Sequence, residues 1–158
     1  MKKKIFMASI VVLILLVCVF GRGIYFYVRY IPDKDYFGEP YEELIHPMSF
    51  KDKGQATEIM GMIDDAFTFV GNKDEAVDKF GELSRYSVTD DDSVAEEHNL
   101  KLITADLNGN KGYLWFAYTQ DAMNSDGQHT HGSSDVLVRA ELEKNTQGWI
   151  IVDTREHP

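Results

Sequence analysis

The apolar residues of this sequence follow three patterns in succession. Residues 5–20 form an uncharged run that only Ser9 interrupts. Between residues 49 and 86, apolar residues recur at spacings of three and four, which is typical of helices that bury one face. From residue 100 onward, short β-rich runs alternate with turns that contain Gly and Asn. The order predicts a membrane segment, then helices, then an antiparallel sheet.

The N-terminal run is short for a membrane helix. Its 16 residues would span roughly 24 Å, against a hydrocarbon core of ~30 Å. Extension to Val28 gives enough length and places Arg22 near one end, where its side chain can reach the headgroups. The residues expected to anchor the segment at the two membrane surfaces are Lys2, Lys3, Lys4, Arg22, Tyr25 and Tyr27.

We expect this segment to be an uncleaved, single-pass signal anchor. The lysines favour a cytoplasmic N-terminus, which places the remaining chain outside the cell membrane. Two alternatives stay open: a signal peptide cleaved near Gly21, which would release a secreted protein, and a lipoprotein anchored at Cys18. The inverse orientation is a weaker alternative. The exported part can form no disulfide, because Cys18 is the sole cysteine.

The distribution of charged residues also separates the N-terminal segment from the rest of the chain. Residues 1–31 hold five of the 16 basic residues and no acid, so the other 127 residues carry 11 bases and all 26 acids, a net charge of −15. This excludes a nucleic-acid partner, which needs a basic surface. It favours a basic protein or a cationic ligand at the cell surface. The acidic part is also rich in large apolar residues, so we expect a folded domain.

Three regions follow from these patterns. Residues 1–31 are the cytoplasmic stub and anchor, residues 32–49 are an acidic spacer, and residues 50–158 are an extracytoplasmic domain. The spacer holds three prolines, and we expect at most a short helical turn, at residues 41–45.

Two helices are predicted at the start of the domain. Ser49 caps the first helix, and its buried stripe would contain Ile59, Ile63, Ala66, Phe67 and Val70. Gly71 would end it. Asn72 caps a second helix that would run to Tyr86 and bury Val77, Phe80 and Leu83. A further short helix is possible at residues 94–98.

The second half of the domain predicts strands. The second strand is apolar on both faces, as in a central strand, and the third alternates cleanly. The fold class is therefore α+β, with the helices on one face of an antiparallel sheet. The expected strands are residues 100–107, 111–120, 135–143 and 149–155.

Two stretches carry a resemblance to a known family. They are Lys111-Gly112-Tyr113-x-Trp115-x-x-Tyr118 and the closing Gly148-Trp149-x-Ile151-Val152-Asp153-x-x-Glu156-x-Pro158. With the helices that precede them, they resemble the cystatin-like or nuclear-transport-factor-2-like superfamily, and more narrowly its membrane-anchored domains in Gram-positive bacteria. The resemblance implies a curved sheet of about four strands wrapped on a helix as a cone. In enzymatic relatives such as ketosteroid isomerase-like proteins, this cone holds a pocket.

The segment 124–135 carries candidate metal ligands. We predict a loop here, in which His129 and His131 could bind a divalent metal if Asp126 or Asp135 completed the set. A solvated turn rich in Gly and Ser is the favoured interpretation, and no cofactor is expected.

Acid–base catalysis would need a carboxylate inside the cone, and the candidates are Asp106 and Asp153. Ile150, Val152 and Thr154 form a charge-free face, which we expect to point toward the helices and leave Asp153 outside.

The aromatic residues Tyr113, Trp115 and Tyr118 could line a binding face or a pocket. The exported part lacks a Gly-x-Ser-x-Gly motif, a phosphate-binding loop and a Cys nucleophile. The sequence therefore favours a non-catalytic binding module over a small-ligand receptor or a lyase- or isomerase-type enzyme.

Overall fold

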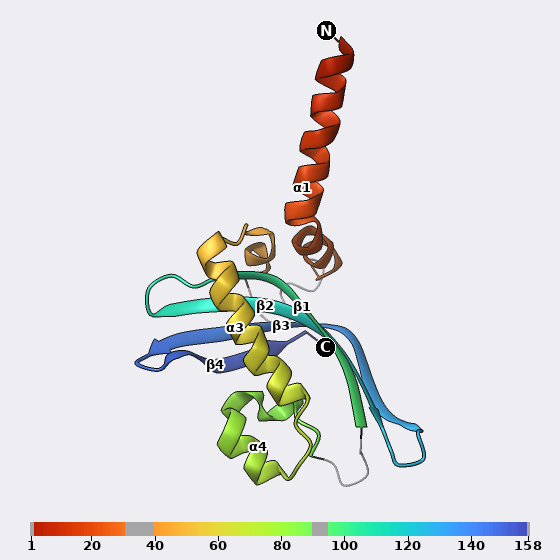
Figure 1. The fold of residues 1–158 in the computed structure, drawn as a ribbon, viewed down its shortest axis with the longest axis vertical. Helices are drawn as coiled ribbons and strands as arrows, with labels where there is room; N and C mark the ends of the chain where they lie inside the picture. Colours follow the sequence, from red (N-terminus) through yellow and green to blue (C-terminus); the bar gives the residue numbers. More distant parts are fainter. Residues whose placement is uncertain (1, 31–39, 90–94, 158) are drawn as a thin grey trace. The chain divides into compact units, whose positions relative to one another are not determined.

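The structure is a computed structural model that describes residues 2–30, 40–89 and 95–157. The chain forms two compact units, Met1–Pro47 and Met48–Pro158. Most of the spacer predicted at residues 32–49 lies outside the described residues, as does the acidic stretch 90–94. Figure 1 shows the elements of each unit.

The first unit contains the helix α1 (Lys2–Tyr30) and the 3-10 helix η2 (Tyr41–Ile45). The latter confirms the predicted helical turn. Within this unit a Cβ at Gly23 would overlap the carbonyl oxygen of Leu44, so the glycine allows η2 to approach α1 closely.

The predicted membrane helix is not confirmed as one straight span. Among the described residues, no single helix has both the length and the mean hydropathy that a membrane crossing requires. The segments Ser9–Val17 and Phe20–Arg29 reach these limits only when they are taken together, across a bend of 62°.

The second unit begins with α3 (Phe50–Phe67), whose N-terminus is capped as predicted. The Ser49 hydroxyl oxygen accepts the backbone N–H of Asp52 at 3.1 Å. One stripe of the helix is buried: Ala56, Ile59, Ile63, Ala66 and Phe67. The predicted end at Gly71 is wrong, because α3 ends at Phe67 and the backbone N–H of Gly71 bonds the carbonyl of Val88 instead of one in the helix. Val70 therefore leaves the stripe, with 55% of its surface exposed.

The second predicted helix is two elements. Asn72 caps α4 (Lys73–Phe80) by accepting the backbone N–H of Glu75 at 2.9 Å. Gly81 ends this helix with a φ of 57°, a conformation that side chains disfavour, and the chain continues as the 3-10 helix η3 (Gly81–Tyr86). Ala76 is the buried residue of α4, whereas Val77 is exposed, contrary to the prediction.

Four strands form one antiparallel sheet in the order of the sequence. Figure 1 shows the curved sheet with α3 lying across one face. The α+β fold class, with helices on one face of about four antiparallel strands, is thus confirmed. The strands are β1 (Ala95–Asp106), β2 (Lys111–Met123), β3 (His129–Asn145) and β4 (Gly148–Glu156).

Two strands begin earlier than predicted. Residues 95–98 are the start of β1, so a helix at 94–98 is wrong, and Val94 lies outside the described residues. Residues 129–134 belong to β3, so the predicted loop shrinks to a turn in which the Asn124 side chain accepts the N–H groups of Asp126 and Gln128. In both strands the added residues are mostly polar. Backbone pairing with β2 makes them strand, and a pattern of apolar residues cannot predict this.

A β-bulge interrupts the alternation in β4. Leu142 pairs with Ile151 and Glu141 with Asp153, so Val152 is left between two pairs. Before the bulge, Trp149 and Ile151 pack against the core, while Ile150 is 42% and Val152 38% exposed. The prediction that Ile150 and Val152 face the helices is therefore wrong, whereas Thr154, beyond the bulge, is buried.

The core of the domain lies between α3, η3 and the helix-facing side of the sheet. The sheet contributes alternate residues of the central strands, which meet the apolar stripe of α3. These sheet residues are Ala105, Leu114, Phe116, Tyr118, Val138, Ala140 and Leu142, and Leu107, directly after β1, joins them.

The bulge predicts different costs for two adjacent isoleucines. Ile151→Ala should lower the free energy of unfolding by roughly 2 kcal/mol, because Ile151 packs on the core. Ile150→Ala should cost about 1 kcal/mol or less, because Ile150 is more exposed. Urea denaturation of both variants measures the difference. A larger loss for Ile150→Ala than for Ile151→Ala would show that Ile150, and not Ile151, faces the helices.

Candidate functional site

The most enclosed candidate site is an apolar pocket at one side of the domain, with a volume of about 360 Å³. This volume is in the lower part of the range for small-molecule pockets. Its walls come from α3, from the α4–η3 segment and from β4. The lining residues are Met62, Asp65, Lys79, Phe80, Leu83, Trp149, Ile150 and Ile151.

Two local departures from regular structure build this pocket. Gly81 breaks the second helix, so that Phe80 ends α4 and Leu83 lies on η3, both at the pocket. The bulge at Val152 places Trp149 and Ile151 on the core side of the sheet. The pocket therefore lies between a broken helix and the regular first half of an edge strand.

Four polar groups lie at or beside the pocket, and the first is the Asp65 carboxylate in its lining. The Lys79 ammonium is 4.8 Å from the centre of the Phe80 ring, a cation–π distance. The Lys144 ammonium is 5.5 Å from the Trp149 ring. The Trp149 indole N–H is buried and has no acceptor among the residues that the structure describes.

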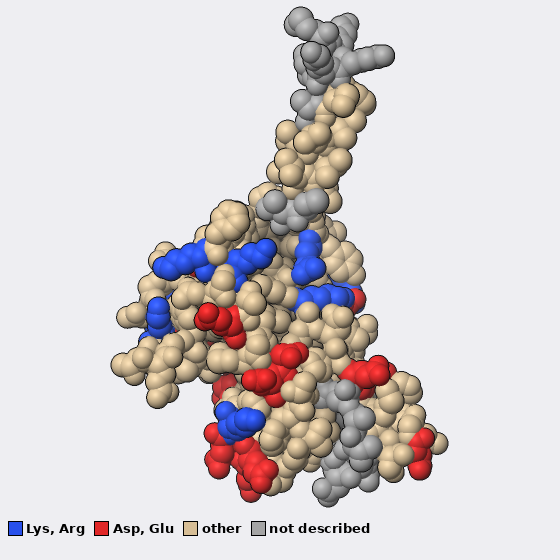
Figure 2. Space-filling view, viewed as in Figure 1, with Lys and Arg blue, Asp and Glu red and all other residues tan. Residues whose placement is uncertain are grey.

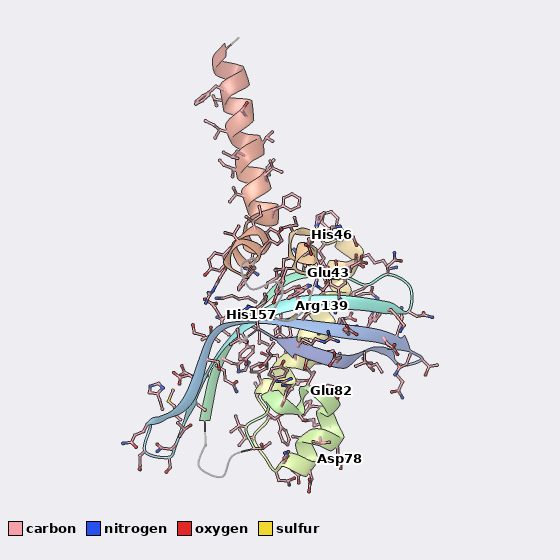
Figure 3. The ribbon with its side chains drawn as sticks, turned by 180° about the vertical axis from the view of Figure 1, so that it is seen from behind. Glu43, His46, Asp78, Glu82, Arg139 and His157 are labelled. Atoms are coloured by element: carbon pink, nitrogen blue, oxygen red, sulfur yellow. The ribbon has the colours of Figure 1, made fainter. Side chains whose placement is uncertain are left out.

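The helical segment that borders the pocket is rich in acidic residues, and Asp65 belongs to the pocket lining. Residues 64–82 carry six carboxylates and two lysines. Figure 2 shows acidic side chains over α4 and the adjoining part of α3, and Figure 3 labels Asp78 and Glu82 on α4 and η3. This segment therefore presents a net negative surface beside an apolar pocket, which is a combination that attracts basic partners. We call residues 64–82 the acidic face.

A second polar cluster lies between η3 and the helix-facing side of the sheet. The Tyr118 hydroxyl donates to the Glu156 carboxylate at 3.3 Å, and the Arg85 guanidinium lies 3.5 Å from the same carboxylate. The Tyr86 ring stacks on Phe67 at 4.9 Å. These rings occupy the concave side of the sheet, so side chains fill this part of the interior.

The tyrosines of this cluster are strongly perturbed. Burial raises the pKa of Tyr118 to about 12, and the negative charge of Glu156 adds to the effect. Burial likewise raises the pKa of Tyr86 above its usual range, again with a contribution from Glu156. Both hydroxyls thus stay protonated at neutral pH, and they are hydrogen-bond donors rather than bases.

The two candidate catalytic carboxylates lie apart from the pocket and from each other. Asp106 lines a shallow depression at the β1–β2 turn with Asn108 and Lys111. Asp153 pairs across the sheet with Glu141, and its carboxylate accepts the Arg155 side chain at 3.0 Å. The structure therefore does not bring these carboxylates together into a site.

The three candidate aromatic residues do not share a face. Tyr118 lies in the core beneath α3. Tyr113 and Trp115 occupy the opposite pleat of β2, where the Arg139 guanidinium is 5.5 Å from the Tyr113 ring and Trp115 is buried. A single binding face made of these three residues is therefore wrong.

The candidate metal ligands are also separated. The His129 ring bonds Asp121 at 2.7 Å, which raises the pKa of His129 above its usual value. Asp135 pairs with Lys101 at 2.7 Å, and Asp126 is exposed in the turn. The side chain of His131 lies outside the described residues. Across the residues that the structure describes, no group of three potential ligands is close enough to hold a metal.

The candidate anchor residues are described in part. Arg22 and Tyr25 are exposed on α1, and Tyr27 is half-buried. The Tyr25 hydroxyl accepts a hydrogen bond from Arg29 at 3.1 Å. The side chains of Lys2, Lys3 and Lys4 lie outside the described residues.

Sequence reasoning missed both clusters as sites, although it named several of their residues. Phe80 and Leu83 were assigned to a buried stripe, and Trp149 and Glu156 to a closing motif. A glycine in the middle of the second predicted helix was the available signal for the pocket, because Gly81 breaks the stripe on which Phe80 and Leu83 lie.

Comparisons with protein-family models, with curated proteins and with solved structures find no match to this chain. The cystatin-like resemblance therefore stays a prediction. The function has to be argued from the geometry of the pocket and the surface around it.

The raised tyrosine pKa values predict a loss of stability at high pH. The pKa of Tyr118 is about 12 in the folded chain and ~10 when unfolded. The contribution of Tyr118 to the free energy of unfolding is therefore fully present below pH ~10 and is lost as the pH rises toward ~12. Urea denaturation between these pH values should show a shallower decline for Tyr118→Phe than for the wild type. Equal slopes would show that Tyr118 ionises without unfolding.

Proposed function

We propose that this chain is a single-pass membrane protein that displays a non-catalytic binding domain outside the cell, and that the partner is basic. The observation that carries the proposal is the pairing of the apolar pocket with the acidic face. A partner that combined an apolar group with positive charge would satisfy both at once.

The lining of the pocket supports binding rather than catalysis. Asp65 and Lys79 are its ionisable residues, and both are exposed to solvent. General acid–base chemistry relies on groups held in fixed geometry where water is excluded. The remaining walls are apolar or aromatic, which suits the anchoring of a partner's side chain.

The interior of the sheet supports the same proposal. Phe67, Tyr86 and Tyr118 pack together within about 6 Å of one another, with centre-to-centre distances of 4.9, 5.1 and 5.7 Å. An enzyme of the cone type would need open space on this side. Here the space is taken by rings that contribute to the core.

The N-terminal segment supports membrane attachment. An acid-free segment of 31 residues begins with three lysines and continues into a 16-residue apolar run. The bent pair Ser9–Val17 and Phe20–Arg29 satisfies the length and hydropathy of a span when taken together. Uncleaved, this segment would hold the acidic domain at the outer surface of a cell membrane.

Thiol labelling tests the topology. Asp126→Cys in a Cys18→Ser background places one cysteine in the exposed β2–β3 turn. An impermeant maleimide should label it on intact cells, and the labelled chain should sediment with membranes. Labelling only after lysis would overturn the exported domain, and labelled chain in the medium would show a cleaved signal peptide.

A matched control uses the other end of the chain. Lys3→Cys in the same Cys18→Ser background should react only after lysis, because we propose that this end is cytoplasmic. Labelling of Lys3→Cys on intact cells, with none at position 126, would indicate the inverse orientation.

Site-specific crosslinking tests the basic partner. A photoreactive benzoylphenylalanine at Val77, which is 47% exposed on the acidic face, should form an adduct with a basic protein in native membranes. The yield should fall as salt rises and in the Asp78→Lys/Glu82→Lys background, because both changes weaken the electrostatic attraction.

The control position is Asn108 in the exposed β1–β2 turn. The same photoreactive residue placed there should give little or none of the adduct. Equal adducts at both positions, or an adduct at Val77 that resists salt and charge reversal, would count against a basic partner.

A further inference from the structure

The pocket borders an open edge of the sheet. β4 is the outermost strand in the sheet order, and the edge strand of a sheet presents one row of backbone N–H and C=O groups away from its partner. Trp149, Ile150 and Ile151 belong both to this strand and to the pocket lining. The edge and the pocket together form one groove, bounded by β4 on one side and by α4–η3 on the other.

The two halves of β4 differ in how the edge is protected. Beyond the bulge, the strand carries Asp153, Arg155 and Glu156, and Arg85 donates to the Thr154 carbonyl at 3.5 Å. Charges, bulges and side-chain contacts of this kind discourage pairing with another chain. Residues 148–151 are uncharged and pair regularly with β3. The unprotected half is therefore the half that borders the pocket.

The chemistry of the groove selects an occupant. Its floor is apolar, and the buried Trp149 N–H has no acceptor among the described residues. Asp65 and Lys79 both line the pocket, so positive charge on the segment that binds is complemented by the acidic face as a whole, with six carboxylates against two lysines.

We infer that this groove receives an extended basic segment of another protein, which pairs with the open edge at residues 148–151 and places an apolar side chain in the pocket. Backbone pairing provides a sequence-tolerant part of the affinity, and the pocket and acidic face provide selectivity. The inference rests on the proposed basic partner and adds the way in which that partner binds.

Synthetic peptides test the inference on the full-length chain in detergent. The probe is acetyl-Lys-Val-Lys-Phe-Lys-Val-Lys-amide, which alternates charge and apolar groups as an added strand would. A Trp115→Phe variant leaves Trp149 as the only tryptophan, so its emission reports on the groove. We expect saturable binding. A second peptide with Glu in place of Lys, and a third with alternate backbone nitrogens methylated, should each bind at least about tenfold more weakly.

The methylated peptide separates this inference from the proposed function. It keeps every charge and side chain but cannot form the ladder of hydrogen bonds. Equal binding of the methylated and unmethylated basic peptides would overturn strand addition and leave the basic partner intact. Binding of the acidic peptide as tightly as the basic one would overturn both, as would no response to any peptide.

Charge variants locate the binding. Asp65→Lys/Glu82→Lys changes two exposed residues of the acidic face and should weaken the basic peptide by at least about tenfold. Glu58→Lys/Asp126→Lys makes the same change in net charge at exposed positions outside the groove lining, and should have a smaller effect. An equal loss in both variants would show attraction by overall charge and overturn the groove as the site.

Discussion

The domain depends on the packing of one helical stripe against the concave face of a four-stranded sheet. Ile59, Ile63 and Phe67 of α3 are almost completely buried there. Phe67 is central, since it contacts rings from both η3 and β2: Tyr86 at 4.9 Å and Tyr118 at 5.1 Å. Cys18 is the single cysteine of the chain, so the domain can form no internal disulfide and the burial of apolar surface has to supply the stability. That packing also fixes where the α4–η3 segment and β4 can lie.

The candidate site exists because two elements are irregular. A continuous second helix would carry Phe80 and Leu83 on a single stripe, and a regular β4 would not combine Trp149 and Ile151 on the core side with Thr154. Gly81 instead breaks the second helix, and the bulge at Val152 shifts the alternation of β4. The result is a groove whose walls belong to the core on one side and to an open edge on the other. Bulges often re-aim side chains in this way near functional sites.

Charged groups have different roles near the core and on the surface of this domain. At the border of the core, the Tyr118 hydroxyl and the exposed Arg85 side chain contact the Glu156 carboxylate, so this partly buried charge has partners. On the surface, the acidic face has a clear excess of carboxylates over lysines. Exposed charges of one sign contribute little to folding, but they guide the encounter with an oppositely charged partner. The cluster at the border of the core therefore supports the fold, and the surface cluster supports recognition.

The sequence by itself determined the order of elements, because each pattern is local. The capping residues Ser49 and Asn72, the stripe of α3 and the turns that separate the strands all follow from residues within a few positions of one another. The tertiary structure decided where Val70, Ile150 and Val152 point and how far β1 and β3 extend. The positions of Ile150 and Val152 and the lengths of the strands depend on strand register and on a bulge, which arise from pairing between distant segments. Gly81 marks the break in the second helix locally, but the groove also needs β4 beside that break, and no local pattern shows this.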